Sequence, residues 1–232
     1  MPLRPVPWRL LPVALAVLLA LPFGSVRADP LRWEKEVEAL ASRASPEPGG
    51  VVFIGSSSIR MWRSLAADFP GFRVRNHGFG GSHLEDSVHF FDRLVRPFAP
   101  SAVVLYAGEN DIAAGMTPEK VRADFEAFRR RLRETAPEAR LVFVSLKPSP
   151  SRVRHLEAMA RANALVAAAC AQDPLCAFVD VATPMLDAAG RPREELFLAD
   201  RLHLNAEGYA LWAARVRPAL EAARPTPAKD LP

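Results

Sequence analysis

Four clusters of polar residues each contain residue types that suit acyl-transfer chemistry, and most of them directly follow short apolar runs. The clusters are Gly55-Ser56-Ser57-Ser58, residues 76–81, residues 108–111 and residues 200–203. A serine hydroxyl becomes a good nucleophile only when a base removes its proton and a third group orients that base. Histidine suits the role of base because its unperturbed pKa lies near neutrality. The sequence therefore predicts a serine-based catalytic site built from these clusters.

Each cluster supplies one part of such a site. Ser57 is predicted to be the nucleophile, at a strand-to-helix turn where its backbone N–H also favours negative charge. His203 is predicted to be the base, and Asp200, three residues earlier, is close enough to orient the imidazole through Nδ1. Attack on a carbonyl creates an oxyanion that needs preorganised donors. Gly81 can offer its backbone N–H with no side chain in the way, and Asn110 can offer its amide.

Taken singly, each of these residues also has a structural explanation. Ser57 could cap the following helix, and Asn110 could form an Asx turn. The glycines of residues 78–81 could form only a turn; they lack the full dinucleotide fingerprint, so no organic cofactor is expected. Asp200 and His203 could be a surface pair or half a metal site, but no further motif at ligand spacing accompanies them, so no metal is expected. The four clusters together favour a catalytic site.

The elements that must position these residues alternate between strands and helices. Apolar, β-branched runs predict strands over residues 51–54, 72–75 (the weakest), 102–106, 141–146 and 177–181. Apolar residues at three- and four-residue spacing predict helices over residues 31–42, 58–68, 84–95, 118–134, 152–169 and 206–223. This alternation predicts an α/β fold, a three-layer α/β/α sandwich with a parallel sheet of about five strands. In such sheets ligands bind beyond the carboxyl ends of the strands, which is where the polar clusters fall.

The order of the clusters resembles the SGNH (GDSL-type) hydrolase family. The chain has Ser in a Gly-x-Ser block, Gly in an Asn…Gly-Gly block, Asn in Gly-x-Asn-Asp, and Asp-x-x-His before the final helix, over residues 51–209. The resemblance implies a flavodoxin-like sandwich, metal-free ester hydrolysis, and the roles given above to Ser57, Gly81, Asn110, Asp200 and His203. Residues 53–62 and 147–152 further resemble a bacterial exported subgroup of this family.

The nucleophile block departs from the family pattern at one position. The usual Gly-Asp-Ser is Gly55-Ser56-Ser57 here, so Ser56 stands in place of an aspartate that has no triad role. The departure leaves Ser56, Ser57 and Ser58 as candidates, and the family register selects Ser57. The other serine-hydrolase signature, Gly-x-Ser-x-Gly, is missing because Ile59 occupies the position of its second glycine.

The predicted function is hydrolysis of a small-molecule or glycan acyl ester through an acyl-enzyme. Two alternatives remain open: a transferase or deacetylase that acts on O-acetyl groups of a cell-envelope polysaccharide with the same site, and a non-catalytic binding protein on the same fold.

The first 28 residues have the pattern of a secretory signal peptide. Arg4 and Arg9 precede an apolar run over residues 10–21, and small residues follow up to Ala28. The run of about 12 residues is shorter than the ~20 that a spanning helix needs, so we expect export to the periplasm or medium, with cleavage after Ala28 and no stable membrane span. The hydrolase domain is then residues 29–223, and the Pro-rich residues 224–232 are expected to be disordered.

Charge gives no indication of a nucleic-acid partner. The whole chain has 30 basic and 26 acidic residues, but three of the basic ones lie within the expected leader. The mature chain is therefore nearly neutral. Arg129, Arg130, Arg131 and Arg133 form a cluster, but with Glu126 and Glu134 nearby they are interpreted as the solvated face of a helix.

The two cysteines, Cys170 and Cys176, are close in sequence. In an exported protein they could form a disulfide that closes the loop 171–175, or they could be two reduced, buried thiols. Geometry decides between these possibilities.

Overall fold

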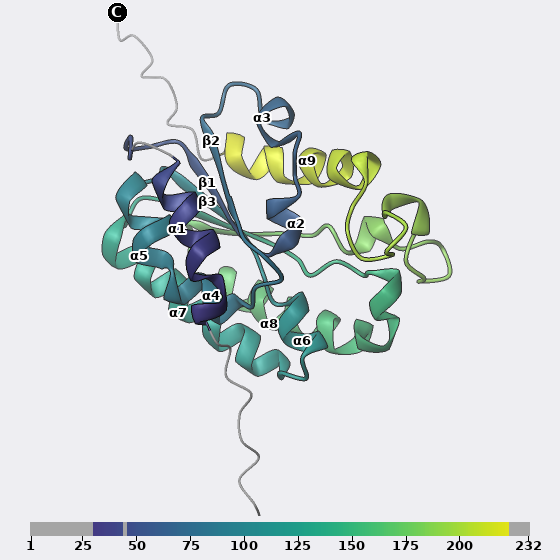
Figure 1. Ribbon diagram of the computed structural model, residues 1–232. Coiled ribbons are helices and arrows are strands. Elements are labelled where there is room, and N and C mark those ends of the chain that lie inside the picture. Colours follow the sequence, from purple (N-terminus) through teal and green to yellow (C-terminus); the bar gives the residue numbers. More distant parts are fainter. Residues whose placement is uncertain (1–29, 44–45, 223–232) are drawn as a thin grey trace, which may run out of the picture.

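The computed structural model describes residues 30–43 and 46–222 (Figure 1). The predicted leader and the Pro-rich tail lie outside these residues. Within them, no helix is both long and apolar enough to cross a membrane.

A five-stranded parallel sheet forms the centre of the fold and confirms the predicted α/β/α sandwich (Figure 1). The strand order is β2-β1-β3-β4-β5, with every neighbouring pair parallel. The strands are β1 (Val51–Gly55), β2 (Val74–Gly78), β3 (Ala102–Tyr106), β4 (Arg140–Val144) and β5 (Cys176–Val179). Strands β1 and β3 are buried along their whole length, which explains their continuous apolar sequences.

Helices connect successive strands. The α-helices are α1 (Glu34–Ser42), α2 (Ser57–Arg60), α3 (Leu65–Asp68), α4 (Leu84–His89), α5 (Phe91–Leu94), α6 (Glu109–Ala113), α7 (Pro118–Thr135), α8 (Leu156–Cys170) and α9 (Ala206–Glu221). Short 3-10 turns are η1 (Pro30–Trp33), η2 (Arg96–Phe98), η3 (Pro150–His155), η4 (Thr183–Met185) and η5 (Glu194–Leu196). The Thr117 side chain accepts the Lys120 N–H at the start of α7, and Pro118 follows it as the first helical residue.

Each face of the sheet has its own apolar core, because successive strand residues point to opposite sides. Helices α1, α4, α5, α7 and α8 cover one face, and α2, α3 and α9 cover the other (Figure 1). On the first face Val52 and Ile54 of β1 pack among phenylalanines of the helices. On the second face Phe53 packs with Trp62, at 5.7 Å between ring centroids. Packing on both faces holds the sheet in place, and with it the segments that leave the carboxyl ends of the strands.

Strand β2 lies further along the chain than predicted. The apolar pattern predicts residues 72–75, but the strand runs from Val74 to Gly78. Its polar residues are satisfied by tertiary contacts: the Asn76 amide donates to the Ile59 carbonyl at 2.7 Å, and His77 Nδ1 lies 2.6 Å from the Leu94 carbonyl oxygen. Because β2 lies at the edge of the sheet and its polar side chains have these partners, its sequence lacks the apolar pattern that predicts a strand.

Three predicted helices also differ from those in the structure: two are divided, and one starts later than predicted. The stretch 58–68 forms the separate helices α2 and α3, because Trp62 turns into the core and its indole N–H donates to Asp68 at 2.6 Å. The stretch 84–95 divides into α4 and α5 at Phe90. Helix α8 starts at Leu156 rather than at residue 152, after the 3-10 turn η3.

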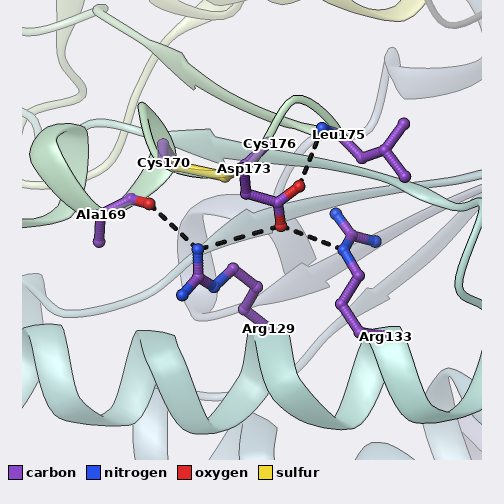
Figure 2. Close-up of a disulfide and its surroundings, with 7 residues drawn as sticks. All are labelled: Arg129, Arg133, Ala169, Cys170, Asp173, Leu175 and Cys176. Atoms are coloured by element: carbon purple, nitrogen blue, oxygen red, sulfur yellow. Dashed lines mark hydrogen bonds and ion pairs between the residues drawn. A yellow bond between two sulfur atoms is a disulfide. The ribbon is translucent and has the colours of Figure 1, made fainter.

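The two cysteines form a disulfide where α8 meets β5 (Figure 2). In the loop that it closes, Asp173 accepts the N–H of Leu175 and pairs with Arg133 at 3.1 Å and Arg129 at 4.0 Å. Cys176 begins β5, so the disulfide lies at the amino edge of the sheet, opposite the polar clusters.

Only part of the arginine cluster is the solvated helix face that the sequence suggests: Arg130 is exposed, whereas the other three arginines have partners outside the helix. The side chains of Arg129 and Arg133 are each 24 % exposed, and Arg131 donates to the Val88 carbonyl and to Asp92. For these three arginines the interpretation was wrong, because their acceptors are Asp173, Asp92 and carbonyl groups outside this helix, and not the glutamates nearby on the same helix.

Candidate active site

The turn after β1 presents Ser57 at the carboxyl edge of the sheet. Gly55 has φ +141°, a conformation that side chains rarely adopt, and a Cβ at this position would lie 1.9 Å from the Tyr106 carbonyl oxygen. Ser56 has extended backbone and precedes the first residue of α2, which is Ser57. Ser56 and Ser58 are buried, whereas Ser57 is partly exposed.

Ser57, His203 and Asp200 form a hydrogen-bonded chain. The Ser57 Oγ lies 3.0 Å from His203 Nε2, and His203 Nδ1 lies 2.6 Å from Asp200 Oδ2. With the proton on Nδ1, the imidazole donates to Asp200 and accepts from the Ser57 hydroxyl. Because both ring nitrogens have these partners, the arrangement is that of a nucleophile, a base and an orienting carboxylate. The three predicted residues lie together in space, although Ser57 and His203 are 146 residues apart in the sequence.

The Asp200 carboxylate is fixed by its own loop. Its Oδ1 accepts the backbone N–H groups of Leu202 and His203, both at 2.9 Å. Desolvation acts to raise the pKa of Asp200, but the hydrogen bonds from the His203 side chain and from these two N–H groups lower it to about 2. Helix α9 begins three residues after His203, with the Asn205 side chain accepting the Gly208 N–H at 3.1 Å. The carboxylate therefore stays negatively charged opposite the imidazole.

Sheet register brings the segments that carry the other predicted residues next to the segment that carries Ser57. Gly55 pairs with Gly78 of β2 on one side and with Tyr106 of β3 on the other. The segments that follow these residues therefore leave the sheet side by side. A Cβ built on Gly81 would lie 3.8 Å from Asn110 Nδ2, so the two predicted oxyanion donors are neighbours.

The loop that carries Gly81 is held by the two polar residues at the start of α6. The Asn110 side-chain amide donates to the Ser82 carbonyl at 3.0 Å. The Asp111 carboxylate accepts the N–H of Leu84, the first residue of α4. Gly81 and Asn110 reach solvent, while Asp111 is fully buried. Backbone and amide N–H groups at this position can stabilise a negatively charged oxygen.

Directly behind Asn110 lies a buried cluster of charged and hydroxyl groups. Glu109 accepts from Lys147 Nζ, from the Ser149 hydroxyl and from the Tyr106 hydroxyl, at 2.6, 2.6 and 2.5 Å. Burial acts to raise the pKa of Glu109, but the positive charges of Lys147 and Arg152 hold it below its usual value. Burial also lowers the pKa of Lys147 and raises that of the Tyr106 hydroxyl well above its usual range.

Sequence reasoning missed Arg152 and did not assign Lys147 a role. Arg152 Nη2 donates to Asn110 Oδ1 at 2.8 Å, and its Nη1 lies 3.4 Å from Glu109 Oε1. The available signal is weak: two basic residues in the Pro-rich stretch 147–152, directly after a buried strand. Their acceptor, Glu109, lies 38 residues before Lys147.

The remaining histidines have structural positions. His77 and His83 are buried, and burial lowers the pKa of both. His83 ends the loop that carries Gly81, and its backbone N–H donates to Asp86 at 2.8 Å. His89 is exposed at the end of α4, and His155 lies 3.0 Å from the Arg154 side chain.

Comparison with known proteins agrees with this arrangement. The chain is 29 % identical over 201 residues to platelet-activating factor acetylhydrolase IB subunit alpha1 of Pongo abelii, with 82 % of each chain covered. Its fold is similar to that of a GDSL-like lipase from Bacteroides thetaiotaomicron, with a TM-score of 0.67, 23 % identity, and coverage of 84 % of this chain and 98 % of the other. It is also similar to an acetyl-xylooligosaccharide esterase from Geobacillus stearmophilus, with a TM-score of 0.62, 16 % identity, and coverage of 76 % and 96 %.

The model of one family covers most of the chain. Residues 50–211 match the GDSL-like lipase/acylhydrolase family, and this range contains all the site residues described above. The match agrees with the SGNH resemblance of the sequence blocks and with the five-stranded parallel sheet. The chain belongs to the GDSL-like lipase/acylhydrolase family and is an ester hydrolase.

Proposed function

We propose that the protein cleaves carboxylic esters through an acyl-enzyme on Ser57. The observation that carries the proposal is the continuous hydrogen-bonded chain from Asp200 through His203 to the Ser57 hydroxyl. A serine with such a base, partly exposed at a sheet edge, has both the activation and the access that nucleophilic attack requires.

The mechanism follows from the positions of the donors and acceptors. His203 Nε2 takes the Ser57 proton as Oγ bonds to the ester carbonyl carbon. The imidazolium then gives this proton to the alcohol oxygen as the carbon–oxygen bond to the alcohol breaks. Water attacks the acyl-enzyme in the second half, with His203 again taking and returning a proton, and the acid leaves. Asp200 stabilises the imidazolium and holds its orientation.

Three donors are assigned to the oxyanion in each half-reaction. They are the backbone N–H groups of Ser57 and Gly81 and the side-chain amide of Asn110. The support is that Gly81 lies against Asn110, and that the two strands preceding these residues pair with β1, the strand that precedes Ser57. Fixed dipoles of this kind stabilise developing negative charge without reorganisation.

We propose an acetyl or other short acyl ester of a small molecule or glycan as the substrate. The support is the relative in Pongo abelii, whose name describes an acetylhydrolase. Export of the chain also remains a proposal, supported by the residue pattern of positions 1–28.

Labelling with a fluorophosphonate probe tests the nucleophile. We expect the purified protein to be labelled at Ser57, and Ser57→Ala to be neither labelled nor active. Ser56→Ala and Ser58→Ala are matched controls from the same turn and should keep labelling. An adduct on another residue in the mass spectrum, or undiminished labelling of Ser57→Ala, would contradict the proposal. Failure of the wild type to label would favour a binding protein.

A panel of p-nitrophenyl esters from acetate to decanoate tests the acyl group, with an acetylated glycan as a second substrate. We expect kcat/KM to be highest for the shortest acyl chains. Product analysis in the presence of a polysaccharide acceptor separates release of free acid from acyl transfer. A preference for long chains, or transfer to the acceptor in place of acid release, would contradict the proposed reaction.

A further inference from the structure

The contacts of the Asn110 side-chain amide engage its oxygen and one of its two N–H groups. A side-chain amide has one carbonyl oxygen and two N–H donors. Oδ1 accepts from Arg152 at 2.8 Å, and one N–H donates to the Ser82 carbonyl at 3.0 Å. The second N–H is left for the oxyanion, on the side where Gly81 approaches Nδ2.

The orientation of this amide depends on its two partners. If the amide were flipped, its NH2 group would face the Arg152 guanidinium and its oxygen would face the Ser82 carbonyl. Both contacts would then be repulsive, because a guanidinium has donors only and a carbonyl is an acceptor only. The flipped amide would also direct an oxygen, rather than a donor, at the oxyanion.

Arg152 is itself held in place by Glu109. Its side chain is only 17 % exposed, and its second arm lies 3.4 Å from Glu109 Oε1. Glu109 is fixed by Lys147 and Ser149 in the buried cluster. A charge held in this low-dielectric environment acts on neighbouring dipoles more strongly than it would in water.

The backbone of the same segment contacts the other half of the site. The N–H of Ser151 donates to the carbonyl of Arg201 at 3.0 Å, between Asp200 and His203 in the triad loop. The segment between β4 and α8 therefore contacts the loop of His203 through its backbone, and it contacts the Asn110 amide through the Arg152 side chain.

We propose that Arg152 is a positioning residue for catalysis: it locks the Asn110 amide in the orientation that donates to the oxyanion and places a positive charge behind it. This inference rests on the function proposed above and extends it to a residue that makes its contact through Asn110 rather than with the substrate.

A double-mutant cycle on kcat tests this inference. Asn110→Ala is expected to lower kcat by about 10²- to 10³-fold, as for loss of one oxyanion donor. Arg152→Met should lower kcat by about 10- to 100-fold with little change in KM, since a small misplacement of a catalytic group costs this much. In the Asn110→Ala background, Arg152→Met should change kcat by less than about twofold, because residues that act through one another are not additive.

Two further variants keep the cycle interpretable. Arg133→Met is the matched control: Arg133 is a half-buried arginine with one ion pair and one bond to a carbonyl, at the opposite edge of the sheet, and kcat should be unchanged. If Arg152→Met does not fold, the cycle is repeated with Arg152→Lys. Lysine keeps the charge but lacks the planar fork that reaches Glu109 and Asn110 together, so the same pattern is expected.

These outcomes distinguish the positioning role of Arg152 from the oxyanion role of Asn110. An equal loss of kcat from Arg152→Met in both backgrounds, or no loss in the wild-type background, would overturn the positioning role while leaving Ser57 and Asn110 in place. An unchanged kcat in Asn110→Ala alone would instead contradict the assigned oxyanion site. Loss of labelling only in Ser57→Ala establishes the nucleophile independently of both.

Discussion

The Asp111 carboxylate accepts the backbone N–H of Leu84, with Oδ1 at 3.0 Å and Oδ2 at 3.2 Å. This bond joins the start of α6 to the start of α4 and thereby fixes the end of the loop that carries Gly81. The carboxylate is buried without a cation at hydrogen-bond distance among the described residues, so desolvation raises the pKa of Asp111 to about 7. The carboxylates of Asp124 and Asp86 act in the same direction.

Asp111→Asn should therefore change the pH dependence of stability. The folded pKa lies above that of the unfolded chain, so the contribution of this group is fully present below about pH 4 and is lost as the pH rises through 7. Relative to wild type, the free energy of unfolding of the variant should rise between pH 4 and 8, by up to about 4 kcal/mol. Urea denaturation across this range measures the difference.

Asp187→Asn is the control of opposite sign. Hydrogen bonds from the Arg191 backbone and side chain lower the pKa of Asp187. Its contribution is therefore present at neutral pH and lost in acid. If the difference between Asp111→Asn and wild type did not change with pH, the raised pKa of Asp111 would be wrong.

Asp200→Asn should lower kcat by about 10³- to 10⁴-fold while leaving the fold intact. The amide oxygen would take the position of Oδ1, which accepts two backbone N–H groups, so the NH2 group would face Nδ1. The imidazole would then carry its proton on Nε2, the nitrogen that faces Ser57, and could not act as the base. Steady-state kinetics and circular dichroism measure the two quantities. Asp173→Asn, in the disulfide loop at the opposite edge, should keep wild-type kcat. A loss of less than tenfold in Asp200→Asn would remove this carboxylate from the mechanism.

Gly55→Ala should destabilise the protein by more than 3 kcal/mol or prevent folding. The new Cβ would meet the Tyr106 carbonyl at 1.9 Å, and that carbonyl already accepts the Ser56 N–H at 3.0 Å. Gly115→Ala separates this clash from backbone strain: Gly115 also has positive φ, +86°, but no atom lies within 4 Å of its added Cβ. It should lower the free energy of unfolding by only about 1–2 kcal/mol, the cost of a left-handed backbone for alanine, as measured by urea denaturation. Equal costs at the two positions would contradict the steric argument.

Replacing both cysteines by serine should lower the free energy of unfolding by about 2 kcal/mol, the chain-entropy value for a loop this short. The disulfide lies at the amino edge of the sheet, so kcat should not change. Dithiothreitol should lower the unfolding midpoint of wild type and leave that of the double variant unaltered. A loss of activity on reduction would show that this end of the molecule influences the site.

The sequence was most informative where local pattern and tertiary environment agree. Buried strands such as β1 and β3 are apolar throughout, and the helix that begins at Thr117-Pro118 is predicted to within one residue. The triad was predictable because its residues lie in blocks with fixed order and spacing. His203 lies within hydrogen-bond distance of both Ser57 and Asp200, as expected.

Features that depend on distant partners could not be predicted. The break between α2 and α3 depends on where the Trp62 ring packs, and the shift of β2 depends on acceptors for Asn76 and His77. The buried cluster is the clearest case: Glu109 and Lys147 lie 38 residues apart in the sequence, and their charges are accommodated in the interior by the ion pair of 2.6 Å between them.

The aromatic packing beneath the nucleophile turn has a spectroscopic consequence. Among the described residues, Trp62 and Trp212 lie in the core on the α9 face of the sheet, and Trp33 lies on the other face. Trp62 stacks on Tyr209, whose hydroxyl donates to the Ser58 carbonyl at 2.8 Å. We therefore expect the emission of Trp62 to respond to changes at the Ser57 turn, which would make intrinsic fluorescence a label-free signal for the proposed acylation of Ser57.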